Sequence, residues 1–500
     1  MNAPVVARLL VTGVLVAAGA TLVPGLSTST SARDEPPIRP TPQARCNDGS
    51  RPETSIQGRV PRRDYDSGRA ARGYTCNTRM VSHTGASGGF KTFHYRDKAG
   101  RSCVFYDSTR MVGTDLPYNL AAGGLGTFAV AMNDARKPRR TATMQTLPSS
   151  SPHESLFLNA RRGLLVSVAG TALTLPGLID VYSVKDDCRR PVLLTSLPFA
   201  GFGHESGFAP DGRTFYASGT FSSLGQGGPA FSAIDLTNPR TPKLLATYPG
   251  QVYHGLRLSP DGNLMYVANI GSPMPAGRVA TGGLRILDVS EIQAREPDPQ
   301  VRVVSDLSYR QMSIPQEADP VVIKGHKYVL ANDEFANFTL GPDLVLSGGY
   351  QEDAPVGAAR LINVDNPRNP FVVSNLRLAV HQLANRSGPQ QNDPGARSPI
   401  GGYTSHYCSV PRYRDPGIVA CSMIGSGLRI FDVRNPYRPK EVGYFNRPTM
   451  PGTRPNGEGA SAMSAPSYDL KRRLVFYTDS YKGLYAVRLA KHIVPRHYWK

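Results

Sequence analysis

Short apolar runs recur along most of the chain, at intervals of about 50 to 75 residues. Large apolar side chains dominate both faces of each run, and turn residues lie between the runs. This pattern predicts β-strands that are buried between neighbouring sheets. The seven runs are Thr127–Met132, Ile179–Val184, Phe231–Leu236, Leu284–Val289, Ala359–Val364, Leu428–Val433 and Leu484–Leu489.

Proline-containing turns divide the segments between these runs. Three runs are followed by an Asn-Pro-x-x-Pro turn, as at Asn435–Pro439. Its second proline has no N–H group and is tolerated only at a sheet edge or at the start of a strand. Two strand-like runs precede each repeat, and in two copies a Pro-Asp-Gly hairpin turn, such as Pro260–Gly262, joins them. Each period therefore predicts an inner hairpin, the repeated strand and an edge strand.

A four-stranded unit that occurs seven times is typical of an all-β, seven-bladed β-propeller. The last repeat ends near Leu489 and has no room for its own edge strand, whereas Thr78–His83 has the pattern of one. We therefore expect this N-terminal strand to join the last blade and close the ring, which removes an exposed sheet edge. The propeller would span residues 76–490, followed by a C-terminal tail at 491–500.

The repeated sequence Gly-Leu-Arg-Ile-Phe-Asp-Val-x-Asn-Pro-x-x-Pro, at 427–439, resembles the LVIVD repeat of secreted bacterial β-propeller proteins. The resemblance implies a propeller at the cell surface or outside the cell, and it assigns no activity. The repeat that begins at Ile179 departs from the pattern, with Ser183 in place of aspartate. The clearest copies lie at 231–246, 283–290, 358–370 and 427–442.

Two segments of different composition precede the repeats. Residues 1–32 combine Arg8, an apolar run and a small-residue cleavage site, which predicts a secretory signal peptide; an uncleaved anchor is the alternative. Residues 33–75 are rich in proline and arginine and predict a linker or loosely held arm. No later stretch is long and apolar enough to span a bilayer. We expect a monomer that is secreted or associated with the cell envelope.

Six cysteines fit an oxidising compartment and allow fifteen pairings. Cys408 and Cys421 lie in two strand-like runs around a turn, so an antiparallel hairpin would place them opposite each other. For the others, the simplest pairing is Cys46 with Cys76 and Cys103 with Cys188. The formal net charge of +19 would attract anionic surfaces. Because no basic stripe with interleaved aromatic residues is present, we expect no nucleic-acid partner.

Polar residues stand at the start of the predicted innermost strands. Matching positions in different blades converge at the mouth of the central channel, so these side chains should line it. The channel-lining candidates are His153, Glu154, His204, Glu205, His254, Glu317 and His406.

The histidines among these candidates can supply neutral imidazoles to Fe, Cu or Zn, with the glutamates as direct or outer ligands. In outline the arrangement looks like propellers of the selenium-binding or carotenoid-cleaving type, which hold a metal on channel histidines. Alternatively, repeated histidines simply solvate a wet channel. The candidate metal ligands are His153, His204, His254 and His406.

Two functions remain open from the sequence. One is a binding or scaffold module at the cell envelope. Its partner would be a protein, a glycan or a small molecule at the channel mouth or at a rim of longer loops. The other is a metal-dependent oxidoreductase or hydrolase that uses the channel histidines, so whether the protein is an enzyme stays undecided. The longer loops are 291–320, 338–357 and 382–402.

Overall fold

The structure is a computed structural model in which residues 32–500 form one compact unit. The predicted signal peptide, residues 1–32, lies outside the described residues, as does most of the predicted loop at 338–357. No helix of the described residues is long and apolar enough to cross a membrane. The structure describes residues 35–108, 126–150, 152–169, 178–198, 204–219, 229–249, 252–271, 282–334, 339–340, 346–347, 356–386, 388–396, 402–449 and 459–499.

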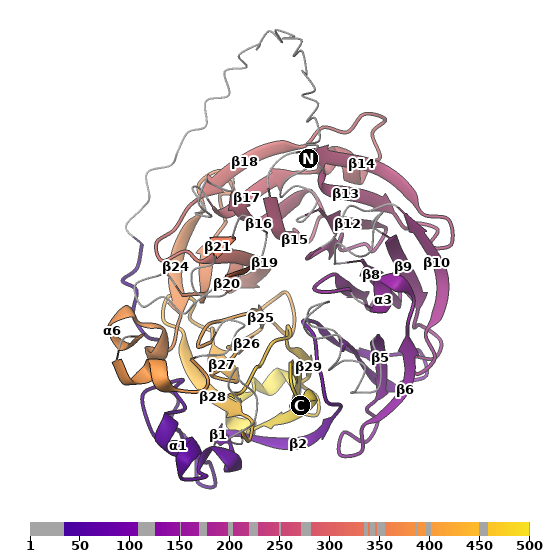
Figure 1. The fold of residues 1–500 in the computed structure, drawn as a ribbon. Helices are drawn as coiled ribbons and strands as arrows, with labels where there is room; N and C mark the ends of the chain where they lie inside the picture. The colour runs from indigo at the N-terminus through magenta and orange to yellow at the C-terminus, as the bar shows by residue number, and fades with distance from the viewer. Residues whose placement is uncertain are drawn as a thin grey trace, which may run out of the picture. The chain divides into compact units, whose positions relative to one another are not determined.

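Seven antiparallel sheets lie around a common centre, each with its first strand innermost (Figure 1). Blade 1 contains β3 (Thr92–Arg96), β4 (Ser102–Asp107), β5 (Thr127–Ala131) and β6 (Arg139–Met144). Blade 2 contains β7 (Leu156–Asn159), β8 (Leu164–Val168), β9 (Leu178–Ser183) and β10 (Val192–Pro198). Blade 3 contains β11 (Gly207–Phe208), β12 (Thr214–Ser218), β13 (Pro229–Asp235) and β14 (Lys243–Pro249). Blade 4 contains β15 (Val252–Leu258), β16 (Leu264–Gly271), β17 (Gly283–Asp288) and β18 (Arg302–Leu307).

The remaining blades complete the ring. Blade 5 contains β19 (Ile314–Ile323), β20 (His326–Glu334), β23 (Ala359–Asn363) and β24 (Phe371–Leu376). Blade 6 contains β25 (Tyr407–Ser409), β26 (Ile418–Ser422), β27 (Leu428–Asp432), β28 (Lys440–Asn446) and β1 (Tyr74–Cys76). Blade 7 contains β29 (Ser467–Asp469), β30 (Leu474–Asp479), β31 (Gly483–Leu489) and β2 (Thr78–Thr84). A separate small hairpin pairs β21 (Thr339–Leu340) with β22 (Leu346–Ser347).

Short helices occur in the described connections and termini. The α-helices are α1 (Arg62–Asp66), α3 (Leu147–Ser150), α5 (Ser290–Ala294) and α6 (Leu383–Arg386). The 3₁₀ helices are η1 (Ala70–Arg72), η3 (Ala379–His381), η4 (Gly388–Asn392), η5 (Lys491–Ile493) and η6 (Arg496–Tyr498).

The predicted seven-bladed propeller and its closure are confirmed. Each repeated run is the third strand of its blade. The N-terminal strand β2 pairs with β31, from Thr78 opposite Leu489 to Thr84 opposite Leu484. Blade 6 differs from the prediction in one respect. Its fourth strand, β28, is not the edge strand, because β1 pairs with it on the outside.

Apolar contacts between neighbouring blades explain why the repeated strands lack polar alternation. All five residues of β27 are buried. Phe431 packs in one cluster with Tyr328 and Leu361 of blade 5, whereas Ile430 packs with Val475 and Tyr477 of blade 7. Each third strand thus buries both faces, which is the arrangement that continuous apolar runs predict.

The N-terminal segment, residues 35–73, packs against blade 6. Val60 and Tyr65 are buried in one cluster with Tyr74 of β1, and the buried carboxylate of Glu53 forms an ion pair with the buried Arg429 of β27. The proline-rich composition did not indicate these contacts, because the partners lie more than 370 residues away in sequence.

Two further segments pack on the propeller. The described part of 382–402 forms α6 and η4, and Arg59 of the N-terminal segment donates to Asp393 there at 2.7 and 3.1 Å. At the C-terminal end, η5 and η6 cover the apolar cluster between blades 6 and 7, where Val494 is buried. Both segments therefore belong to the folded unit.

Three disulfide bonds stabilise the unit, as the simplest pairing predicts. Cys408 and Cys421 are direct partners across β25 and β26, and their Cα atoms are 4.0 Å apart. Of the other two bonds, the Cys46 bond ties the N-terminal segment to β1, and the Cys103 bond ties β4 of blade 1 to the connection that follows β9. These two bonds are Cys46–Cys76 and Cys103–Cys188.

Candidate metal centre in the central channel

The seven candidate residues lie in or just before the first strands of five blades. His153 and Glu154 precede β7, and His204 and Glu205 precede β11. His254 lies in β15, Glu317 lies in β19, and His406 immediately precedes β25. The structure places all seven at the inner strands, but in two separate clusters.

Three imidazoles and two carboxylates make up the first cluster, here called the histidine cluster: His204, His254, His406, Glu154 and Glu334. The Nε2 atom of His406 lies 3.3 Å from Glu154 and 3.1 Å from Glu334. The Nε2 atom of His254 lies 3.4 and 3.2 Å from the same two carboxylates. His204 Nε2 is 3.3 Å from Glu154. Apart from His204, whose side chain is 10% exposed, these side chains are at most 5% exposed.

The fourth candidate histidine, His153, lies beside this cluster and is half-buried. Its ring centroid is 4.4 Å from that of His204. His153, Glu154 and His204 each offer one ligand atom within 4.8 Å of the others, and so do Glu154, His254 and Glu334. His153 therefore lies at the more exposed side of the histidine cluster.

Backbone carbonyl groups orient two of the imidazoles. His254 Nδ1 is 3.1 Å from the carbonyl oxygen of Gln316, and His406 Nδ1 is 2.5 Å from that of Met463. A carbonyl oxygen only accepts, so each Nδ1 carries the proton and donates it. This tautomer leaves Nε2 directed at the carboxylates, as in metal-binding histidines whose other nitrogen is held by a backbone carbonyl.

One neighbouring amide sets the positions of both carboxylates. Gln316 Nε2 donates to Glu154 at 3.0 Å and to Glu334 at 3.1 Å, so one amide holds both groups. The residue after His254 is Gly255, and a Cβ atom there would lie 2.3 Å from the carbonyl oxygen of Gln316 and 2.3 Å from Glu205. Close packing thus explains why this position carries glycine.

Burial and opposite charges compete in the histidine cluster. Burial disfavours charge on His406, yet its hydrogen bonds with Glu154 and Glu334 raise its pKa to about 9. Burial acts in the same way on His254, and the same carboxylates raise its pKa. Burial disfavours charge on Glu154 too, but the neighbouring histidines hold its pKa well below the usual range. The two carboxylates therefore favour the charged forms of His254 and His406.

Glu205 and Glu317 belong to a second cluster, here called the ion-pair cluster: Lys91, Glu205, Arg257, Glu317 and Asp319. Lys91 Nζ is 2.6 Å from Glu205, and Arg257 contacts all three carboxylates, with Nε 2.8 Å from Asp319. Burial, together with Asp319 and Glu205, raises the pKa of Glu317 well above its usual value. These two candidates therefore contact Lys91 and Arg257 and do not join the imidazoles.

Glu334 of the histidine cluster and Gln316, which donates to both carboxylates of that cluster, were not among the candidates predicted from the sequence. Both could have been found from strand alternation. Asp333 points away, pairing with Arg360 at 2.9 Å, so its neighbour Glu334 faces the other side of β20. Gln316 precedes Glu317 on β19 and occupies the place that histidine takes in blades 2, 3, 4 and 6. The candidates predicted from the sequence were histidines and glutamates at strand starts. Gln316 is an amide at the start of β19, and Glu334 is a carboxylate at the end of β20.

Fold and site together define a seven-bladed β-propeller with a histidine and glutamate cluster in its channel. No protein-family model matches the chain, and no curated protein matches it, so the relation to the LVIVD repeat stays a prediction.

Solved structures resemble the chain at low sequence identity. A protein from Lactobacillus plantarum is 12% identical at a TM-score of 0.47, covering 76% of this chain and 89% of its own. Hydrazine synthase from Kuenenia stuttgartiensis is 11% identical at 0.47, covering 82% and 97%. A putative 6-phosphogluconolactonase from Bacteroides fragilis is 10% identical at 0.43, covering 73% and 89%. Likeness at this level assigns no activity.

Proposed function

We propose that this protein is a metal-dependent enzyme whose channel binds one divalent transition-metal ion at the histidine cluster. The main support for this proposal is the convergence of three Nε2 atoms on two carboxylates at 3.1–3.4 Å. Charge-assisted hydrogen bonds are shorter, at about 2.7–2.9 Å. Ligands about 2.1 Å from a metal ion lie about 3.0–3.4 Å from one another in octahedral or tetrahedral geometry.

Charge and donor chemistry support the same proposal. Glu154 and Glu334 carry two negative charges, which a divalent cation balances when the imidazoles are neutral. His254 Nε2 and one oxygen of Glu154 are buried and form no hydrogen bond of regular geometry with any described residue. Imidazole and carboxylate ligands suit Fe, Cu or Zn. Structural zinc sites are commonly rich in cysteine, whereas histidine and glutamate are common in catalytic sites that keep a position open for substrate.

The residues of the chain divide the work of such a centre. His204, His254 and His406 would hold the ion with the two glutamates, and Gln316 would keep the carboxylates in place. A bound metal would supply Lewis-acid chemistry for a hydrolase or electron transfer for an oxidoreductase. The half-buried His153 would face the arriving small molecule. The metal that the protein carries decides between these two reaction classes.

We infer that this enzyme works outside the cytoplasm. Three disulfide bonds favour an oxidising compartment. The apolar segment within residues 1–32 supports secretion, and sequencing the N-terminus of the mature protein would test it. An N-terminus near residue 33 is expected, whereas an intact Met1 would favour the anchored alternative.

Metal analysis of the full chain tests the enzyme proposal. The protein, purified without chelators, should contain about one metal ion per chain by elemental mass spectrometry. After chelation it should take up Co²⁺ in a one-to-one ratio, and the visible absorption of the Co²⁺ complex reports the ligand set. His254→Gln and Glu334→Gln should each weaken Co²⁺ binding at least about tenfold, since each removes one ligand.

A matched control separates this centre from surface binding. His326 is an exposed histidine that pairs with Asp365 at 2.8 Å, so His326→Gln removes an imidazole next to a carboxylate outside the channel. Its Co²⁺ affinity and spectrum should match those of the unmodified protein. A folded protein that carries no metal and takes up neither Co²⁺ nor Zn²⁺ would show that the histidines only solvate the channel. The binding-module function would then be preferred.

A further inference from the structure

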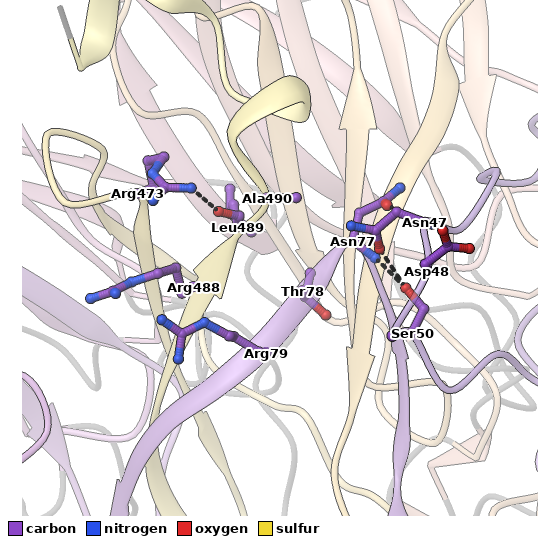
Figure 2. A pocket seen from close by; sticks show the side chains of 11 residues that line it. Asn47, Asp48, Ser50, Asn77, Thr78, Arg79, Arg473, Arg488, Leu489 and Ala490 are labelled. Atoms are coloured by element: carbon purple, nitrogen blue, oxygen red, sulfur yellow. Dashed lines mark hydrogen bonds between the residues drawn. The ribbon is translucent and has the colours of Figure 1, made fainter.

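An arginine-lined cavity lies where the N-terminal strand closes the ring (Figure 2). Its volume is about 280 Å³, and it opens to solvent between the N-terminal segment, β2 and the end of β31. Three arginines line it: Arg79 of β2, Arg488 of β31 and Arg473 of the turn between β29 and β30. It is distinct from the histidine cluster, because it lies at the outer strands of blade 7.

Two of these arginines face each other across the closing strand pair. Arg79 is the direct partner of Arg488 in the antiparallel register. Like charges at such positions destabilise a sheet. Arg473 adds a third positive charge, and its Nη1 donates to the carbonyl oxygen of Leu489 at 3.1 Å. The seam that closes the propeller therefore carries an electrostatic cost.

No carboxylate of the described residues neutralises this group by an ion pair. The buried Nε atom of Arg488 has no hydrogen-bond partner, and burial together with the charges of Arg79 and Arg473 lowers its pKa. Asp48 is the one acidic residue of the lining and is exposed. In Figure 2 it lies on the other side of Thr78 from the arginines.

We propose that this cavity binds a phosphate group, either as free inorganic phosphate or as the end of a phosphate monoester. Planar guanidinium groups match the oxygens of phosphate in bidentate geometry. A dianion between Arg79 and Arg488 removes their repulsion, so binding also stabilises the closed ring. Asn77 and Ser50 supply further polar groups at the cavity wall.

Calorimetry on the full chain at constant ionic strength tests the proposal. Inorganic phosphate and glycerol 3-phosphate are titrated separately, and the melting temperature is recorded with each. Saturable binding of phosphate with a rise in melting temperature supports the site. Tighter binding of the monoester identifies an ester as the ligand, whereas equal or weaker binding identifies free phosphate. If neither compound binds, the proposal is wrong.

Variants of Arg79 and Arg488 provide a second test, because they should change the phosphate affinity and the melting temperature in opposite directions. Arg79→Gln and Arg488→Gln should each weaken phosphate binding at least about tenfold, because each removes a charged hydrogen-bond donor. In phosphate-free buffer, both should raise the melting temperature, because the like-charge pair is gone.

Arg302→Gln is the control, since it removes one charge from an exposed arginine that pairs with Glu291. It should leave the phosphate affinity unchanged. An equal loss of affinity in this control would show that phosphate responds only to net charge. If Arg79→Gln has a lower melting temperature without phosphate and an unchanged phosphate affinity, the arginines only stabilise the pairing of β2 with β31. Either result overturns the proposal.

Discussion

Replacing Arg429 by methionine should destabilise the protein in a pH-dependent way. Arg429 belongs to the repeated sequence of β27, and its side chain is fully buried together with those of Glu53 and Glu441. Its Nη1 is 3.0 Å from Glu441, its Nη2 bonds Glu53, and its Nε donates to the carbonyl oxygen of Ser426 at 2.9 Å. One cation thus holds two carboxylates, one of them from the N-terminal segment.

The magnitude follows from the charges left behind. At an effective dielectric constant of about 20, each pair attracts by about 4 kcal/mol, and the desolvation of the three groups offsets most of this. Removing the cation alone leaves two carboxylates buried without a partner. The expected loss is about 3–5 kcal/mol.

The pH dependence has a definite sign. Burial already raises the pKa of Glu53 against the effect of Arg429, and removing that charge should raise it further. Between the unfolded and the folded pKa of such a carboxyl group, the folded state binds more protons, so stability falls as pH rises. The loss caused by Arg429→Met should therefore be larger at pH 8 than at pH 5.

Denaturant unfolding at both pH values, followed by circular dichroism, measures this loss. The triple variant Arg429→Met with Glu53→Gln and Glu441→Gln is the control, because it removes all three charges and keeps similar shapes. It should recover much of the stability at pH 8. A loss below about 1 kcal/mol at pH 8, or an equal loss at both pH values, would refute the reasoning.

Three further predictions concern closure, cross-linking and acid stability. Deleting residues 78–84 should lower the free energy of unfolding by about 5 kcal/mol, at about 1 kcal/mol for each ladder hydrogen bond, and expose β31. Calorimetry should show a lower melting temperature, and size-exclusion chromatography should show self-association. If both measurements are unchanged, the closure of the ring by this strand is contradicted. Replacing Cys408 and Cys421 by serine should cost about 3 kcal/mol for a loop of 13 residues, and an unchanged unfolding midpoint contradicts this. Burial lowers the pKa of His94 to about 4, so stability should fall by up to about 3 kcal/mol as pH falls from 6.5 to 4. His94→Gln should flatten that acid limb in urea titrations, and an unchanged limb would argue against the shift.

The candidate site was only partly accessible from the sequence. Repeat position placed His204, His254 and His406 at equivalent strand starts, because a propeller repeats the geometry of its blades. It could not separate Glu154, which meets the imidazoles, from Glu205, which forms an ion pair with Lys91. That difference depends on which cations the neighbouring blades present, and these lie far away in sequence.

Local pattern by itself determined the fold of this protein. Apolar runs, Asn-Pro turns and their spacing were sufficient for seven blades and for closure by residues 78–83, because each blade has local signals and contacts mainly its neighbours. Only the tertiary structure decided where Glu53 and Glu334 act. Glu53 finds its partner in β27, and Glu334 meets histidines from other blades. Such contacts depend on how the blades converge and on what burial does to their charges, and no local pattern records either.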